Sequence, residues 1–253
     1  RGNVLTGFRV RAGGDIRIVG GVEGAELEAE GSMEITGGIM AGGKGAVKAG
    51  KNVRCSFIQD ANVFASEDII VSQSIMHSNI RAGRSVICYG AKGLIVGGSI
   101  QAGEKVKART IGNTMSTATS IEVGVAPELR SELNELRKQQ RQLADNLDKT
   151  LKALALLDQM AAVGQLGQDK LVMRQKLWTT KRQTTEELEV VKERILEIEK
   201  LLEETENARV EAVNTIYGGT RIVIGRYTRF VKEPCSRVYF KFADGEITML
   251  PLY

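Results

Sequence analysis

The sequence predicts a mainly β fold with an α insertion, namely a right-handed parallel β-helix (a solenoid) interrupted by a long antiparallel coiled-coil hairpin. Three observations support this prediction. A seven-residue motif recurs six times before residue 115, a heptad pattern of apolar residues follows Pro127, and the motif returns near residue 216. We therefore expect a β-helix of about seven coils over residues 1–126, a helical hairpin over 127–213, and a final coil with a capping β-hairpin over 214–253.

The recurring motif opens on an aliphatic residue, has Ala at its third place and closes on another aliphatic residue at its seventh. The six copies open at Val10, Leu27, Val47, Val63, Ile80 and Ile100. Their spacings of 17, 20, 16, 17 and 20 residues are typical of a solenoid. The uneven coil length favours a right-handed helix over the left-handed type, which keeps a stricter hexapeptide period.

Each copy predicts about three short strands. Two places after the closing residue stands another small or apolar one, and alternation of this kind places both on one face of a strand. These residues are Ile18, Ile35, Cys55, Val71, Cys88 and Ala108. A third apolar position follows at Val22, Ile39, Ile58, Ile75 and Ile95. Glycine pairs such as Gly37-Gly38 suit the corners, because glycine tolerates positive φ.

Two further copies are expected on either side of the insertion. One opens at Met115, with Thr117 at its third place and Ile121 at its closing place. The other opens at Ile216 and has apolar residues at its first, seventh and ninth places. The hairpin is therefore expected to interrupt the solenoid rather than to follow it.

Two long helices are predicted between these copies. Apolar or small residues from Leu129 to Ala161 recur at alternating steps of four and three residues, which is a heptad pattern. Glycines at 164 and 167 end the first helix and form a turn, so the second helix must return antiparallel. The apolar seam expected on the second helix is Leu188, Val191, Ile195, Ile198, Leu202 and Thr205.

The C-terminal segment predicts a β-hairpin. Apolar residues alternate between Val238 and Leu250 around Asp244-Gly245, a dipeptide that favours a tight hairpin turn. We expect this hairpin to cover the last coil and to protect edge strands that would otherwise invite aggregation.

Composition excludes several classes of function. A net charge of +4 over 253 residues is too mild to indicate nucleic-acid binding without a local patch. No run of 18 apolar residues occurs, so we expect no membrane span. Three cysteines without paired spacing fit a reducing compartment, and we expect a cytoplasmic protein. No His, Cys and carboxylate cluster has metal-ligand spacing, and we expect neither metal nor cofactor.

Four motifs, in this order, resemble the flagellar assembly protein A family. They are residues 75–83 (IMHSNIRAG), 92–98 (KGLIVGG), 108–112 (ARTIG) and 121–127 (IEVGVAP). In that family a β-solenoid leads into a coiled coil at the same place, and the resemblance covers nearly the whole chain. It implies a bacterial cytoplasmic protein with a role in flagellar assembly or polar cell organisation and without known catalytic residues. The solenoid is similar, more distantly, to the bactofilin cytoskeletal proteins.

His77 is the only histidine, and Asp60 holds the matching place one coil earlier. An Asp that orients a His is a common start for acid–base catalysis. No third member is evident, so the favoured interpretation is a structural corner pair or plain solvent exposure. We expect no catalytic residue, although an enzyme with its site at this pair is an alternative.

A second candidate is the basic and aromatic stretch over residues 217–237, which includes Arg226 and Arg229. Such a composition can bind single-stranded nucleic acid by charge and stacking. This gives a second hypothesis, a nucleic-acid-linked regulator, although exposed residues of late coils are the favoured interpretation and nucleic acid is not the expected partner.

The leading hypothesis is a non-enzymatic scaffold that binds other proteins, among them flagellar or polar machinery. A helical arm of about 60 Å offers a heptad surface to a partner or to a second copy. The expected contact residues are those of the hairpin turn and of the seam, namely Gly164, Gln165, Leu166, Gly167, Leu188 and Ile195. A further alternative is self-assembly through the solenoid ends, as in bactofilins, so a homo-oligomer is also considered.

Overall fold

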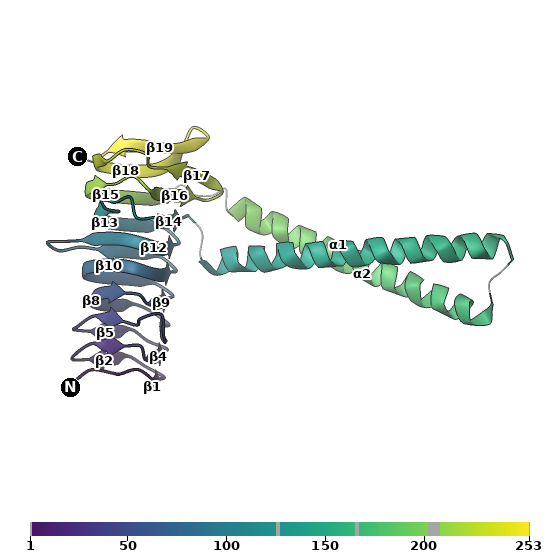
Figure 1. The fold of residues 1–253 in the computed structure, drawn as a ribbon, viewed down its shortest axis with the longest axis horizontal. Helices are drawn as coiled ribbons and strands as arrows, with labels where there is room; N and C mark the ends of the chain where they lie inside the picture. The colour runs from purple at the N-terminus through teal and green to yellow at the C-terminus, as the bar shows by residue number, and fades with distance from the viewer. Residues whose placement is uncertain (1, 125–126, 165–166, 202–207, 253) are drawn as a thin grey trace. The chain divides into compact units, whose positions relative to one another are not determined.

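The computed structural model describes residues 2–124, 127–164, 167–201 and 208–252. The chain divides into two compact units, one formed by Arg1–Pro127 together with Leu202–Tyr253 and the other by Glu128–Leu201. The first unit is a β-solenoid whose strands stack coil upon coil (Figure 1). The second contains two helices.

The solenoid strands form three columns of parallel pairs. The first column contains β1 (Arg9–Ala12), β4 (Glu26–Ala29), β7 (Ala46–Ala49), β9 (Asn62–Ala65), the end of β10 (Asp68–Ala82), the end of β12 (Leu94–Ala102), β14 (Thr119–Val123) and β16 (Thr220–Ile224). The second contains β2 (Ile16–Ile18), β5 (Met33–Ile35), the start of β8 (Val53–Gln59), the start of β10, β11 (Ser85–Cys88), β13 (Lys105–Ile111) and β15 (Arg209–Ile216). The third begins with β3 (Val22–Glu23) and β6 (Ile39–Met40) and continues through the later parts of β8, β10, β12, β13 and β15.

Like residues stack on like residues inside these columns. Ala29, Ala49, Ala65, Ala82 and Ala102 form a ladder whose members are at most 4% exposed. The aliphatic residue two places earlier is equally buried from Leu27 to Ile100. The six motif copies thus fall in register, as the sequence predicted, because an in-register stack buries each apolar residue against its equivalent in the next coil.

The solenoid continues in register across the helical insertion. β13 pairs with β15, and β14 pairs with β16, all in parallel. The sequence predicts that the solenoid resumes at residue 214, but the second-column strand β15 already begins at Arg209. Val210 and Ala212 pair with Val106 and Ala108, so these two residues complete the column that the insertion interrupts.

The expected register of the two copies that flank the insertion was wrong. Ile121 pairs with Ile100, so it opens its copy rather than closing it, and Met115 is 85% exposed. Likewise Ile222 pairs with Ile121 and opens the next copy. Ile216 pairs instead with Ile111 in the third column. One buried aliphatic residue resembles another in sequence, and only the strand pairing distinguishes the columns.

Antiparallel strands cover the last coil. β17 (Tyr227–Phe230) pairs with β16, and β18 (Cys235–Ala243) pairs with both β15 and β19 (Glu246–Pro251). Asp244 and Gly245 both have positive φ, 54° and 88°, as expected of a tight turn between twisted strands. The rings of Tyr227 and Phe242 stack with centroids 4.3 Å apart and join the two hairpins.

The helices are α1 (Pro127–Ala162) and α2 (Gln168–Leu201). Ion pairs join Glu132 to Arg194 at 2.7 Å and Asp158 to Arg174 at 2.6 Å, so the helices run antiparallel within their unit. The buried residues of α2 are Thr184, Leu188, Val191, Ile195 and Ile198, which repeat at steps of four and three. The expected seam residues Leu202 and Thr205 lie outside the described part of the chain.

Candidate functional site

Asp60 and His77 occupy the same corner in consecutive coils. Gln59 pairs with Met76 and Asn62 with Asn79, and the two corner residues between them both have a φ of 47°. Both line a depression of about 480 Å³. The corner geometry, rather than chemistry, explains the residue types, because Asp and His are among the few L-residues that enter the left-handed region readily.

The geometry does not join these two residues as a catalytic pair. Asp60 accepts a hydrogen bond of 3.3 Å from Gln59 Nε2. The His77 ring lies against the following coil, where a Cβ added to Gly97 would be 2.5 Å from His77 Nδ1. No hydrogen bond or ion pair connects Asp60 to His77 among the described residues.

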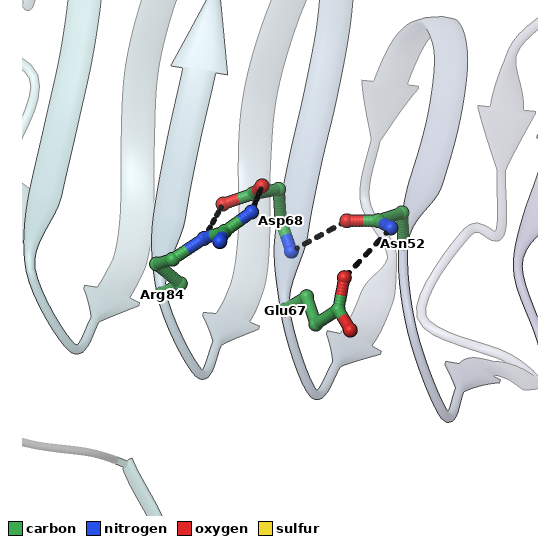
Figure 2. Close-up of polar contacts among 4 residues, drawn as sticks. All are labelled: Asn52, Glu67, Asp68 and Arg84. Carbon is green, nitrogen blue, oxygen red and sulfur yellow. Dashed lines mark hydrogen bonds and ion pairs between the residues drawn. The ribbon is translucent and has the colours of Figure 1, made fainter.

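A polar network of four residues lies at a different corner of the solenoid (Figure 2). Asn52 donates to Glu67 at 2.9 Å and accepts from the backbone N–H of Asp68 at 3.0 Å. Arg84 donates through two nitrogens to the Asp68 carboxylate, with Nε 3.1 Å from Oδ1. The bidentate guanidinium holds the pKa of Asp68 below its usual range, even though partial burial of that carboxyl acts in the opposite direction.

This network ties three consecutive coils together. Asp68 pairs with Ser85 in the second column. Asn52 directly precedes β8, the strand on the other side of Asp68, and accepts a hydrogen bond from the Asp68 backbone. Asp68 raises the pKa of the Arg84 guanidinium most, and the carboxylates of Glu67 and Glu104 raise it further. Every polar group has a partner from a neighbouring coil, so we interpret the network as a structural corner rather than a site of catalysis.

Cys55 and Cys88 face the solenoid interior. Both are buried, and burial raises the pKa of each thiol to about 12. A thiol with such a pKa is neutral at physiological pH and is a poor nucleophile or metal ligand. In the described residues no group of three or more His, Cys, Asp or Glu side chains is placed to hold a metal ion.

The expected contact residues of the hairpin fall into three groups. Gly164, with a φ of 71°, and Gly167 are exposed at the turn. Gln165 and Leu166 lie outside the described residues. Leu188 and Ile195 are only 8% and 7% exposed, because the heptad seam that singles them out in the sequence is the part that the helices bury.

Sequence reasoning missed the exposed apolar side chains of the helices and of the turn between them. Between residues 151 and 178 these are Leu151, Leu156, Val163, Leu171, Val172, Met173 and Trp178, each at least 42% exposed. Nearer the other end of α2 only Val190, Leu196 and Leu201 are comparably exposed among the described residues. The sequence does show apolar residues outside the predicted seam. A search for heptads, however, treats positions outside the seam as solvent-exposed flanks and does not consider them further.

Arg226 and Arg229 of the basic and aromatic stretch both form contacts within the solenoid. Arg229 donates to the backbone carbonyl of Ile247 at 2.5 Å and lies over the Phe240 ring. Arg226 is exposed, yet it donates to the Tyr227 hydroxyl at 3.1 Å and lies over the same ring. Since Tyr227 is itself stacked on Phe242, these groups complete the cap of the solenoid.

The comparisons with known proteins agree with the fold. None of the helices within the described residues has the length and apolarity needed to cross a membrane. Neither curated proteins nor solved structures give a match to the chain. Residues 1–247 match the family described as Flagellar Assembly Protein A beta solenoid domain. This match spans almost all of the chain, both flanks of the helical insertion included, and the chain therefore belongs to the Flagellar Assembly Protein A β-solenoid family.

Proposed function

We propose that this protein is a non-enzymatic scaffold that acts in the cytoplasm during flagellar assembly and binds other proteins through its helical hairpin. Family membership supports the process, and the three free cysteines fit a reducing compartment. The proposal assigns no catalytic step to any residue.

The observation that carries the proposal is the exposed apolar surface of the helices between residues 151 and 178. Trp178 is 46% exposed, Met173 55% and Leu156 60%. Exposed apolar patches on soluble proteins mark interaction sites, and Trp and Met are enriched at the centres of such interfaces. We call Leu156, Met173 and Trp178 the hairpin patch, a name that refers to their shared segment of the two helices.

The solenoid supports this role by its rigidity. Its interior residues are close to fully buried from Leu27 to Ile224, and each coil is hydrogen-bonded to the next. A body of this kind holds its surface residues at fixed spacings, which suits a platform for assembly.

The test replaces the hairpin patch by polar residues that keep the helix. Leu156→Gln, Met173→Gln and Trp178→Gln are combined in one variant, since Gln is a good helix former. We expect a strain that carries only this variant to assemble fewer or misplaced flagella, counted by electron microscopy. Circular dichroism checks that the helix content is unchanged.

The matched control is Val190→Gln with Leu196→Gln, which removes equally exposed apolar side chains at the other end of α2. Normal flagellation in the control and defective flagellation in the patch variant supports the proposal. Normal flagellation in both variants refutes the hairpin patch as the contact surface.

Mass measured by light scattering identifies the kind of partner. The intact chain is compared with a chain in which residues 128–201 are replaced by a short Gly/Ser linker. A dimer that becomes a monomer on deletion assigns the hairpin patch to a second copy of this chain. Two monomers assign it to a different protein.

A further inference from the structure

In the described strands of this solenoid, six of the eight pairs of charged residues that face each other have opposite signs. Such pairs are stabilising in a sheet, whereas like charges directly opposite are destabilising. The facing pairs of opposite sign in the described strands are Arg9 with Glu26, Arg11 with Glu28, Glu28 with Lys48, Arg17 with Glu34, Glu34 with Arg54, and Lys107 with Glu211.

One run of residues departs from this pattern. Lys105 faces Arg209, and Arg209 faces Lys241, so three cations occupy consecutive strands β13, β15 and β18. Neighbouring strands lie about 4.8 Å apart, so the three side chains start within about 10 Å of one another. In the described strands these are the only two facing pairs of like charge, and we call the three residues the cation column.

The surroundings of the cation column leave it only partly neutralised. Glu211 is 5% exposed and binds Arg209 Nε at 2.8 Å and Lys107 Nζ at 3.1 Å. This single carboxylate therefore serves two cations. Lys105 and Lys241 form no ion pair with any described residue.

The cation column lines a depression of about 640 Å³. Glu104 and Glu211 are its acidic lining residues, while Tyr239 brings a hydroxyl group to the same depression. The side chain of Ser85, which also lines it, is hydrogen-bonded to Asp68. With Lys107 beside it, the site has four cations and two carboxylates, an excess of two positive charges. A concave surface with excess positive charge and an added hydroxyl donor is suited to an anion.

We propose that this depression binds a multivalent oxyanion, a molecule with several phosphate or carboxylate groups that span the cation column. The ligand offsets the repulsion between Lys105, Arg209 and Lys241, and the Tyr239 hydroxyl donates to one of its remaining oxygens. This binding site and the hairpin patch share no residue, so the anion-binding proposal can fail without affecting the proposed scaffold function, and the reverse also holds.

The primary test is isothermal titration calorimetry of the whole chain with tripolyphosphate, citrate and single inorganic phosphate as probes. We expect saturable binding of a multivalent probe that weakens as salt is raised, and much weaker binding of single phosphate. Tighter binding of tripolyphosphate identifies phosphate groups as the ligand chemistry, and tighter binding of citrate identifies carboxylates. Absence of saturable binding to both multivalent probes overturns the proposal.

A matched pair of double variants separates a built site from general charge. Lys105→Gln with Lys241→Gln removes two cations that lie two strands apart, and it should weaken binding at least about 10-fold. Lys48→Gln with Arg81→Gln removes two cations at the same separation, on either side of Phe64 in the first column. This control should bind as the natural chain does, and an equal loss in both variants overturns the proposal.

Thermal stability gives a second readout that needs no ligand affinity. At low salt and without anion, Lys105→Gln with Lys241→Gln should melt at a higher temperature than the natural chain, because it relieves the repulsion within the cation column. Added tripolyphosphate or citrate should raise the melting temperature of the natural chain and leave that of this variant unchanged. Equal shifts in both chains contradict the assigned site.

Discussion

The solenoid and the helical hairpin are both built from short sequence repeats, but they bury their repeated residues very differently. Solenoid positions such as Ile80, Ile100 and Ile121 are fully buried, and every coil between two others contacts both. The helices bury a narrow seam at 0% to 8% exposure, as at Ile198 and Ile195, and leave Trp178 and Met173 half exposed. We therefore expect stability to be concentrated in the solenoid, while the helices leave more apolar surface exposed to solvent.

The charges of the two regions differ in the same way. Solenoid charges face partners on the next coil in a fixed register, as Arg17 faces Glu34. Helix charges reach across on long side chains, as Arg137 reaches Glu199 at 2.9 Å with both groups at least 40% exposed. Exposed pairs of this kind contribute little, about 0–1 kcal/mol each, so the helices depend mainly on their seam.

The comparison is tested most strongly by cutting one aliphatic side chain in each region. Ile100→Ala should lower the free energy of unfolding by about 3–4 kcal/mol, because the surrounding ladder cannot collapse into the cavity. Ile195→Ala, which is 7% exposed at the helical seam, should cost about 1–2 kcal/mol in the unfolding of the helices. Urea denaturation followed by circular dichroism measures both, and equal costs would remove the contrast between the regions.

A glycine substitution sharpens the contrast within the solenoid. A Cβ at Gly83 would lie 2.0 Å from the carbonyl oxygen of Ser66, so the corner backbone must shift to admit Ala. We expect Gly83→Ala to destabilise the solenoid by about 2–3 kcal/mol. A Cβ added at Gly14 would have no atom within 4 Å, and Gly14 does not have a positive φ. Gly14→Ala should therefore change the free energy of unfolding by less than about 0.5 kcal/mol. If the two melting temperatures fall together, close coil contact is not the cause.

The smallest expected effect comes from the Asp68 carboxylate and depends on pH. Arg84 lowers the pKa of Asp68 in the folded state, so this carboxylate stabilises the fold above its ordinary pKa near 4. That contribution, about 1 kcal/mol, is lost as the pH falls through the lowered folded-state pKa. The stability difference between the natural chain and Asp68→Asn should therefore be constant near neutral pH and should vanish in strong acid. A difference that grows on acidification would reverse the assigned sign.

The sequence predicted the solenoid columns well because each interior residue repeats at its own place in every coil. Val47, Val63 and Ile80 share one column in the structure, as their common place in the motif requires. Register failed only beside the insertion, where Ile121 and Ile216 had no intact copy on both sides to fix their column. Strand pairing over a long chain separation leaves no periodic signal in the sequence.

The candidate surfaces were harder to predict than the fold. A heptad search identifies residues that are buried, such as Leu188, and passes over exposed residues such as Trp178. The cation column was hidden for another reason. Its three residues, Lys105, Arg209 and Lys241, are far apart in the chain. They come together only because β15 pairs with β13 and β18 pairs with β15.

The in-register return of the solenoid after the helices has a consequence for how the chain folds. Within the early coils, hydrogen-bonded partners such as Asn62 and Asn79 are 17 residues apart, so each coil closes a short loop onto the one before. Arg221 and Ser120 are 101 residues apart, and closing that loop costs more entropy and comes later. We expect rapid local formation of α1 and α2 to shorten the effective loop and so to speed the closure of the last coils. Lengthening both helices by whole heptads should leave the refolding rate nearly unchanged, whereas replacing them by a flexible chain of equal length should slow it.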